Sequence, residues 1–158
     1  AQAEEAAKKE GLESVKYAVP STNEIAQTVQ VMSRQVDFIY VPLDNTIANA
    51  MQTVVKEANK ANIPVIPSVD TMVEQGGLAT IGINQYQLGL QSGKMAAELA
   101  SGKEKPETTP VYTFDQGDTV INQSQADRLG IIVPQSMKEK AKIITDDSQQ
   151  ETSKEDDK

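Results

Sequence analysis

Short apolar runs alternate along the chain with longer segments in which apolar residues recur every three or four positions. The run at 36–41 is rich in β-branched and aromatic residues and ends at Pro42, which predicts a buried strand. Three polar residues follow it: Asp44, Asn45 and Thr46. From Ile47 the helical spacing continues for about four turns. Strand, polar tip and helix is the order in which α/β folds hold ligands at the carboxyl ends of their strands.

The same patterns predict the remaining elements of the first hundred residues. Helices are expected at 1–10, from 21–24 onward, at 71–75 and at 85–100, and strands at 12–19, 63–67 and 78–83. Helices and strands therefore alternate, which predicts an α/β fold with a doubly wound parallel sheet.

The alternation breaks after residue 102. We expect a linker at 103–110, a strand-like segment at 111–114, a strand at 118–122, a short helix at 124–129 and a final helix at 136–144. Residues 145–158 carry six acids and two lysines, a net charge of −4, which is half of the net charge of −8 of the chain. This composition predicts a disordered acidic tail.

Composition limits the function more than it defines it. The chain has 158 residues and a net charge of −8, which allows one domain with a core and argues against nucleic acid or an anionic membrane surface as a partner. Cysteine and histidine are absent, so thiolate chemistry, Ser-His-Asp catalysis and the usual zinc ligands are excluded. We expect no cofactor and no metal. No apolar run approaches the ~20 residues of a membrane-spanning helix.

Two carboxylates follow neighbouring predicted strands, Asp44 after one and Asp70 after the next. Parallel strands lie about 5 Å apart, so both carboxylates can face one crevice. A metal site needs a third acid and acid–base catalysis needs a second base, and neither stands out. Recognition of a ligand ammonium or hydroxyl group needs one carboxylate and a few donors, such as Asn45 and Thr46. The competing explanation is that Asp44 or Asn45 only caps the next helix.

Helix capping is also the favoured role of a second polar group, Ser21, Thr22 and Asn23, with ligand contact as the alternative. Tyr86 follows the strand at 78–83, beside Asn84, where its ring either stacks on a ligand or covers the end of the sheet.

The glycines at 89 and 93 suggest a phosphate-binding loop. However, the spacing is one residue short, Met95 replaces the Ser or Thr that such loops need, and the stretch lies inside a helix. Small residues at 89, 93, 96 and 97 indicate close packing against a sheet or another lobe instead.

An ordered series of short motifs gives a more specific signal. Its members are YVPLDNT (40–46), IPVIP (63–67), GGLAT (76–80), GINQYQLG (82–89), GKMAA (93–97), VIN (120–122) and ADRLGI (126–131). The series resembles the substrate-binding proteins of ABC importers with the type I periplasmic-binding-protein fold, in the class associated with tryptophan and tyrosine. The resemblance covers residues 1–144.

The resemblance implies two lobes joined by three crossovers, with ligand bound in the cleft between them. Residues 1–83 would be the second ligand-binding lobe without its first strand, and 84–110 a helix and linker that cross toward the absent first lobe. Residues 111–144 would be the return crossover and C-terminal helix, and 145–158 the acidic tail.

The resemblance also implies a non-catalytic receptor component of an importer that binds a small solute, an amino acid. The residues expected to contact the ligand are Ser21, Asn23, Asp44, Asn45, Thr46, Asp70, Asn84 and Tyr86. Asn84 stands where the family often has an aspartate. The resemblance further implies that permease subunits are partners of the protein. Its location would be extracytoplasmic, either periplasmic or on the cell surface, and a lipid anchor outside this chain would be the only membrane contact. A sugar or nucleoside receptor, the effector domain of a regulator, and a small α/β enzyme using Asp44 and Asp70 remain open.

Overall fold

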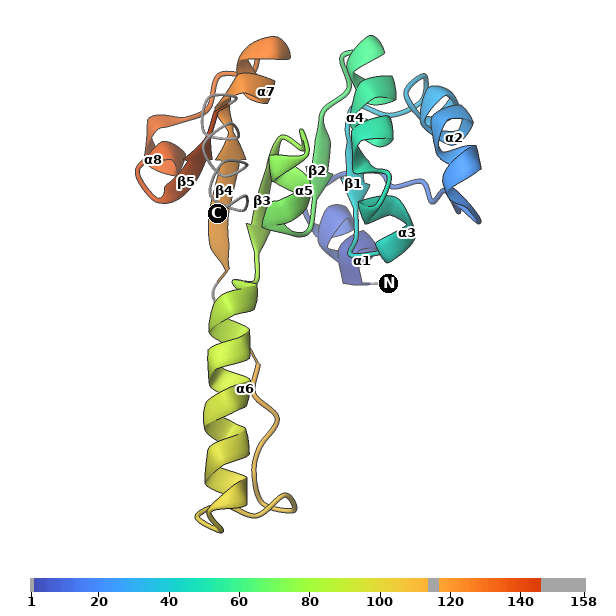
Figure 1. The fold of residues 1–158 in the computed structure, drawn as a ribbon. Helices are drawn as coiled ribbons and strands as arrows, with labels where there is room; N and C mark the ends of the chain where they lie inside the picture. Colours follow the sequence, from blue (N-terminus) through green and yellow to red (C-terminus); the bar gives the residue numbers. More distant parts are fainter. Residues whose placement is uncertain (1, 114–116, 146–158) are drawn as a thin grey trace, which may run out of the picture.

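The computed structural model describes residues 2–113 and 117–145. Helices and strands form a head, from which one long helix, α6 (Gln85–Ala100), projects (Figure 1). The segment 101–113 returns toward the head beside α6 (Figure 1).

The elements of the head come in two groups. The first consists of α1 (Gln2–Lys9), η1 (Thr22–Glu24), α2 (Ile25–Met32), β1 (Ile39–Val41), α3 (Asn45–Ala48), α4 (Met51–Lys60), β2 (Val65–Pro67) and α5 (Asp70–Glu74). The second consists of β3 (Ala79–Gly82), β4 (Asp118–Asn122), α7 (Gln123–Arg128), α8 (Gln135–Lys138) and β5 (Ala141–Ile144).

The strands form two short sheets that meet at β2 and β3. β1 pairs with β2 in parallel, and β4 pairs with β5 in parallel. The backbone N–H of Leu78 donates to the carbonyl of Val65 at 2.7 Å, and that of Asn122 donates to the carbonyl of Leu78 at 2.9 Å. The first bond joins the two sheets edge to edge, and the second extends the pairing of β3 with β4 by one residue.

The α/β class and its parallel pairing are confirmed, but the sheet is not wholly parallel. β3 and β4 pair antiparallel, with Gly82 opposite Asp118. The reason is the excursion through α6. The chain leaves the head at the end of β3 and re-enters it at the same edge, so that β4 must run back in the opposite direction (Figure 1).

The main core lies between α2, α4 and the first sheet. Its fully or nearly fully buried side chains include Ile25 and Val29 of α2, Val41 of β1, and Met51 and Ala58 of α4. The buried positions of α4 recur at helical spacing, as its sequence predicts. This packing fixes β1 and β2, and with them the loops that follow these strands.

One buried acid lies at the edge of this core. Glu57 is 7 % exposed, and it accepts hydrogen bonds from Lys60 Nζ at 2.7 Å and from Gln30 Nε2 at 2.9 Å. Lys60 first, and then Gln30, hold the pKa of Glu57 below its ordinary value of 4.5.

Three sequence predictions about elements are wrong. Residues 12–19 form no strand, because they have no ladder partner in the described parts of the chain, and Val19 packs against the main core instead. The helix expected at 136–144 is the short α8 followed by β5, because pairing with β4 overrides the helical pattern. The helix expected from Ile47 starts at Asn45 and is broken between α3 and α4.

The part of the chain after α6 gives a mixed result. Residues 111–113 are irregular and not a strand, and Phe114 lies outside the described residues. The strand at 118–122 is confirmed with the predicted bounds. The predicted acidic tail lies outside the described residues from 146 onward.

Candidate functional site

The loops after β1 and β2 end at the same edge of the sheet. Val41 lies opposite Pro67 in the parallel register, and Asp44 and Asp70 each follow three residues later. The first turns of α3 and α5 begin at this point. We call this the strand-end edge; it also includes the end of β3 and the starts of β4 and β5.

Both carboxylates hold the start of a helix. Asp44 Oδ1 accepts a hydrogen bond from the Ile47 N–H at 3.1 Å, which makes it the N-cap of α3. The capping role considered for Asp44 is therefore confirmed. Asp70 Oδ1 accepts from the Thr71 N–H at 2.9 Å. In each case one carboxylate oxygen is engaged by the backbone.

A pocket of about 330 Å³ opens at this edge, between the start of α5, the end of β3 and the starts of β4 and β5. Its lining includes six polar residues: Asp70, Asn84, Asp118, Thr119, Lys140 and Lys142. Two of the predicted ligand-binding residues, Asp70 and Asn84, are therefore brought together here.

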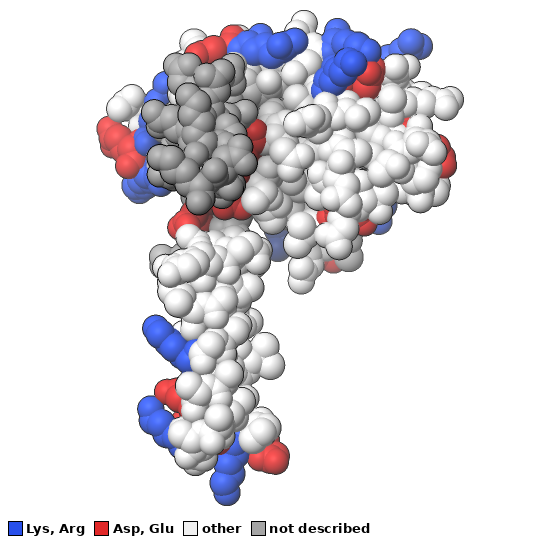
Figure 2. All heavy atoms as spheres, viewed as in Figure 1, with Lys and Arg blue, Asp and Glu red and all other residues white. Residues whose placement is uncertain are grey.

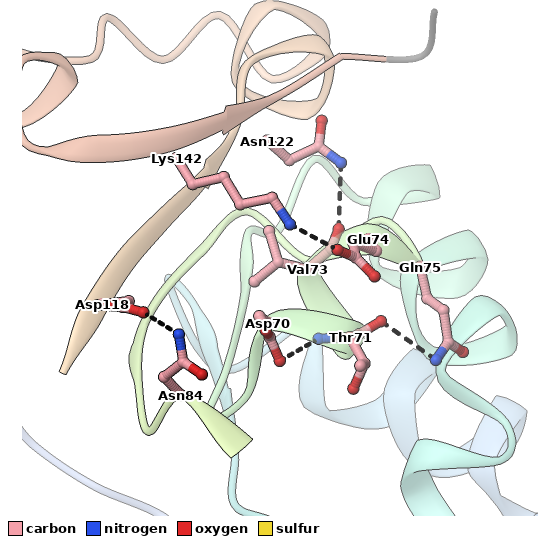
Figure 3. A network of polar contacts seen from close by, with 9 residues as sticks. All are labelled: Asp70, Thr71, Val73, Glu74, Gln75, Asn84, Asp118, Asn122 and Lys142. Atoms are coloured by element: carbon pink, nitrogen blue, oxygen red, sulfur yellow. Dashed lines mark hydrogen bonds and ion pairs between the residues drawn. The ribbon is translucent and has the colours of Figure 1, made fainter. Parts of the chain in front are cut away.

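Asn84 links the start of α6 to the start of β4 beside this pocket. Its Nδ2 donates to Asp118 Oδ2 at 2.8 Å (Figure 3). Its Oδ1 accepts from the Gln87 N–H at 3.0 Å, which makes Asn84 the N-cap of α6. An aspartate at position 84 would place a second carboxylate against Asp118. The asparagine avoids this repulsion and fixes the direction in which α6 leaves the head.

Two further contacts hold α5 against the second sheet. The buried Asn122 donates from Nδ2 to the Val73 carbonyl at 3.2 Å, and Lys142 Nζ lies 3.1 Å from Glu74 Oε1 (Figure 3). Asn122 Oδ1 also accepts from the Gln125 N–H at 2.9 Å and so caps α7. Through α5, these contacts set the position of Asp70 relative to β4 and β5.

The other predicted contact residues do not line this pocket. Ser21 Oγ donates to Glu24 Oε1 at 3.1 Å and makes no capping bond to the backbone, so the favoured capping role is not seen for Ser21. Tyr86 lies in the first turn of α6 with 72 % of its side chain exposed. The remaining predicted residues are found in η1 and in the first turn of α3; they are Asn23, Asn45 and Thr46.

Sequence reasoning missed three charged residues of the pocket, namely Asp118, Lys140 and Lys142. The two lysines were assigned to a helix, where residues two apart lie on different faces. Instead, Lys140 lies in the turn after α8 and Lys142 lies in β5. The alternation of lysine with alanine and isoleucine over 140–143 was the signal that could have identified this strand.

The surface charge is uneven (Figure 2). Lysine and arginine side chains gather at the end of the head opposite α6 and around the far tip of α6, whereas the half of α6 nearest the head is uncharged (Figure 2). In sequence, this uncharged half is Gln85–Gly93. Over the described ranges 2–113 and 117–145, no helix is long and apolar enough to cross a membrane, and no group of three or more acidic side chains could hold a metal ion.

Comparison with known proteins identifies the family. Residues 2–144 match the model of the ABC transporter substrate binding protein family, and the chain belongs to this family. It is 36% identical over 117 residues to the tyrosine-binding protein of Clostridioides difficile (strain R20291), in an alignment that covers 74% of this chain and 34% of that protein. The family predicted from the motif series is thus confirmed.

Two solved structures support the same assignment. The crystal structure of an ABC domain in complex with L-Trp from Streptococcus pneumonia is 47% identical with a TM-score of 0.82, and covers 90% of this chain and 50% of that chain. The ligand-free, open structure of a substrate binding protein with adhesive properties from Clostridium difficile is 34% identical, with a TM-score of 0.72. The match covers 90% of this chain and 48% of that chain. The chain spans about half the length of these solved relatives.

Proposed function

We propose that this chain is one lobe of a two-lobed receptor of an ABC importer, and that its strand-end edge is one wall of a cleft that binds an aromatic amino acid. The observation that carries the proposal is the pocket at this edge, where Asp70 and Asn84 meet Asp118 at the ends of neighbouring strands. The relatives named for tyrosine and L-Trp support the choice of ligand.

The strand-end edge has the groups that an amino acid needs. Asp70 and Asp44 each have one carboxylate oxygen bound to a backbone amide, which leaves the second oxygen of each for a ligand ammonium. Tyr86 offers an exposed ring on which an aromatic side chain can stack. Ser21, Asn23, Asn45 and Thr46 remain proposed as further polar contacts.

The exposure of α6 supports a second lobe. None of its sixteen residues is buried, and a Cβ added at Gly89 or Gly93 would meet nothing within 4 Å in the described chain. A lone helix of this length is marginally stable in water, so most helices are stabilised by packing of one face. We propose that the first lobe covers the uncharged half of α6, with the small residues allowing close approach.

The same proposal includes the partners and the location. Permease subunits would receive the ligand on the outer side of the membrane, and any lipid anchor would lie outside this chain. A catalytic role for Asp44 with Asp70 would require both carboxylates at one reacting atom. Only Asp70 lines the pocket, while Asp44 caps α3, and this favours a receptor over an enzyme.

Calorimetric titration of the full-length receptor tests the proposal. L-tryptophan, L-tyrosine and L-phenylalanine should give saturable one-site binding, whereas ribose and adenosine should give no heat of binding. Binding of the sugar or the nucleoside without any amino acid would overturn the choice of ligand. Turnover of a bound amino acid by the purified receptor would overturn the non-catalytic role.

A further inference from the structure

The pocket at the strand-end edge contains four charged side chains, and two of them already have partners. Asp118 accepts the hydrogen bond from Asn84 at 2.8 Å, and Lys142 pairs with Glu74 at 3.1 Å. These two pairs hold the starts of α6 and β4, and α5, in place. The charge of Lys142 is therefore paired within the protein, and one oxygen of Asp118 is engaged by the neutral amide of Asn84.

The other two charged side chains are Asp70 and Lys140, and they are of opposite sign. Asp70 gives one oxygen to the Thr71 N–H, and its second oxygen has no partner among the residues that the structure describes. Lys140 makes no ion pair or side-chain hydrogen bond within those same residues. Among the residues that the structure describes, the second oxygen of Asp70 and the ammonium group of Lys140 therefore line the same pocket without a partner.

The turn before β5 brings Lys140 to this pocket. Lys142 lies opposite Val120 in the parallel pairing of β4 with β5, and its side chain extends toward α5, where it meets Glu74. Lys140 is two residues earlier, in the turn between α8 and β5, and it lines the pocket at the strand-end edge.

We propose that this pocket is a zwitterion site, in which Lys140 binds the carboxylate of an amino acid and Asp70 binds its ammonium group. The inference rests on the proposed function and adds a specificity-determining residue to it. A volume of about 330 Å³ is within the range of small-ligand sites. Because the zwitterion is neutral overall, its binding pairs both free charges at once.

The arrangement predicts which ligand groups are required. An analogue without the amino group leaves Asp70 unpaired, and one without the carboxylate leaves Lys140 unpaired, and each unpaired charge weakens binding. Groups outside this pocket, such as Tyr86 and the other lobe, would then select among amino acids by the side chain of the ligand.

Calorimetry on the full-length receptor provides the test. The wild type, Lys140→Gln, and the matched control Lys138→Gln would be titrated with L-tryptophan, L-tryptophanamide and indole-3-propionate. Lys140→Gln removes one charged hydrogen bond and should therefore bind L-tryptophan about 10- to 150-fold more weakly than the wild type. The same variant should change the affinity for L-tryptophanamide, which has no carboxylate, by less than about threefold.

The control separates a specific contact from general electrostatics. Lys138→Gln removes the same charge two residues away, at a side chain that does not line the pocket, and should change the affinity for L-tryptophan by less than about threefold. Equal affinities of wild type and Lys140→Gln, or equal losses in both lysine variants, would overturn the zwitterion site while the proposed function stands. Absence of any amino-acid binding by the wild type would instead overturn the proposed function. Circular dichroism of each variant confirms that it is folded.

Discussion

Asn122 is the side chain whose removal should most directly loosen the junction between the two sheets. It is 3 % exposed, caps α7 through the Gln125 N–H and donates to the Val73 carbonyl of α5. Loss of an N-cap costs about 0.5–2 kcal/mol. The Val73 carbonyl keeps its bond from the Gly76 N–H at 3.0 Å, so the second loss is the net value of one hydrogen bond, about 0.5–1.5 kcal/mol. We expect Asn122→Ala to destabilise the protein by about 1–3.5 kcal/mol.

Urea unfolding of the full-length receptor, followed by circular dichroism, measures this loss. The midpoint should fall with an unchanged slope, because the same surface is exposed on unfolding. Gln123→Ala is the matched control, since Gln123 bonds only to Asp127 on the exposed side of the same helix, and it should change stability by less than about 0.5 kcal/mol. Similar midpoints for the two variants would refute the role assigned to Asn122.

Three further predictions concern the cap, the buried acid and the isolated chain. Asp44→Asn keeps the capping oxygen and should weaken amino-acid binding in calorimetry without loss of stability. Asp44→Ala should weaken binding and also lower the free energy of unfolding in urea by about 0.5–2 kcal/mol. Unchanged binding in both variants would exclude contact of Asp44 with the ligand. The lowered pKa of Glu57 stabilises the protein above pH 4.5, and this stabilisation is lost as the pH falls through the folded pKa. The urea midpoint of Glu57→Gln should therefore fall less between neutral pH and about pH 3 than the midpoint of the wild type. Parallel curves of midpoint against pH for the two proteins would contradict this. The isolated 158-residue chain should bind amino acids weakly or not at all and unfold without a sharp transition, and a cooperative monomeric melt would be the opposite result.

The elements that depend on local signals were predictable from the sequence. The helix 85–100 and the strand 118–122 have the predicted bounds, and Asp44 caps a helix as its position after a strand suggests. These features rest on apolar periodicity and capping chemistry, which neighbouring residues determine.

The features that depend on distant pairing were not predictable. Residues 12–19 have the alternation of a strand but no described ladder partner, and β5 forms only because β4 lies beside it. The same applies to the pocket. Lys140 is seventy residues from Asp70 in sequence, and the two line one pocket only because β5, which follows Lys140, pairs with β4. The motif series identified the family, but it could not place this lysine at the site.

A crystal structure of the full-length receptor with its bound aromatic amino acid tests whether the strand-end edge is a wall of the ligand cleft. The ligand should lie at this edge, with its amino group at hydrogen-bonding distance, roughly 3 Å, from the carboxylate of Asp70. A ligand bound without contact to any residue that follows β1, β2 or β3 would contradict it.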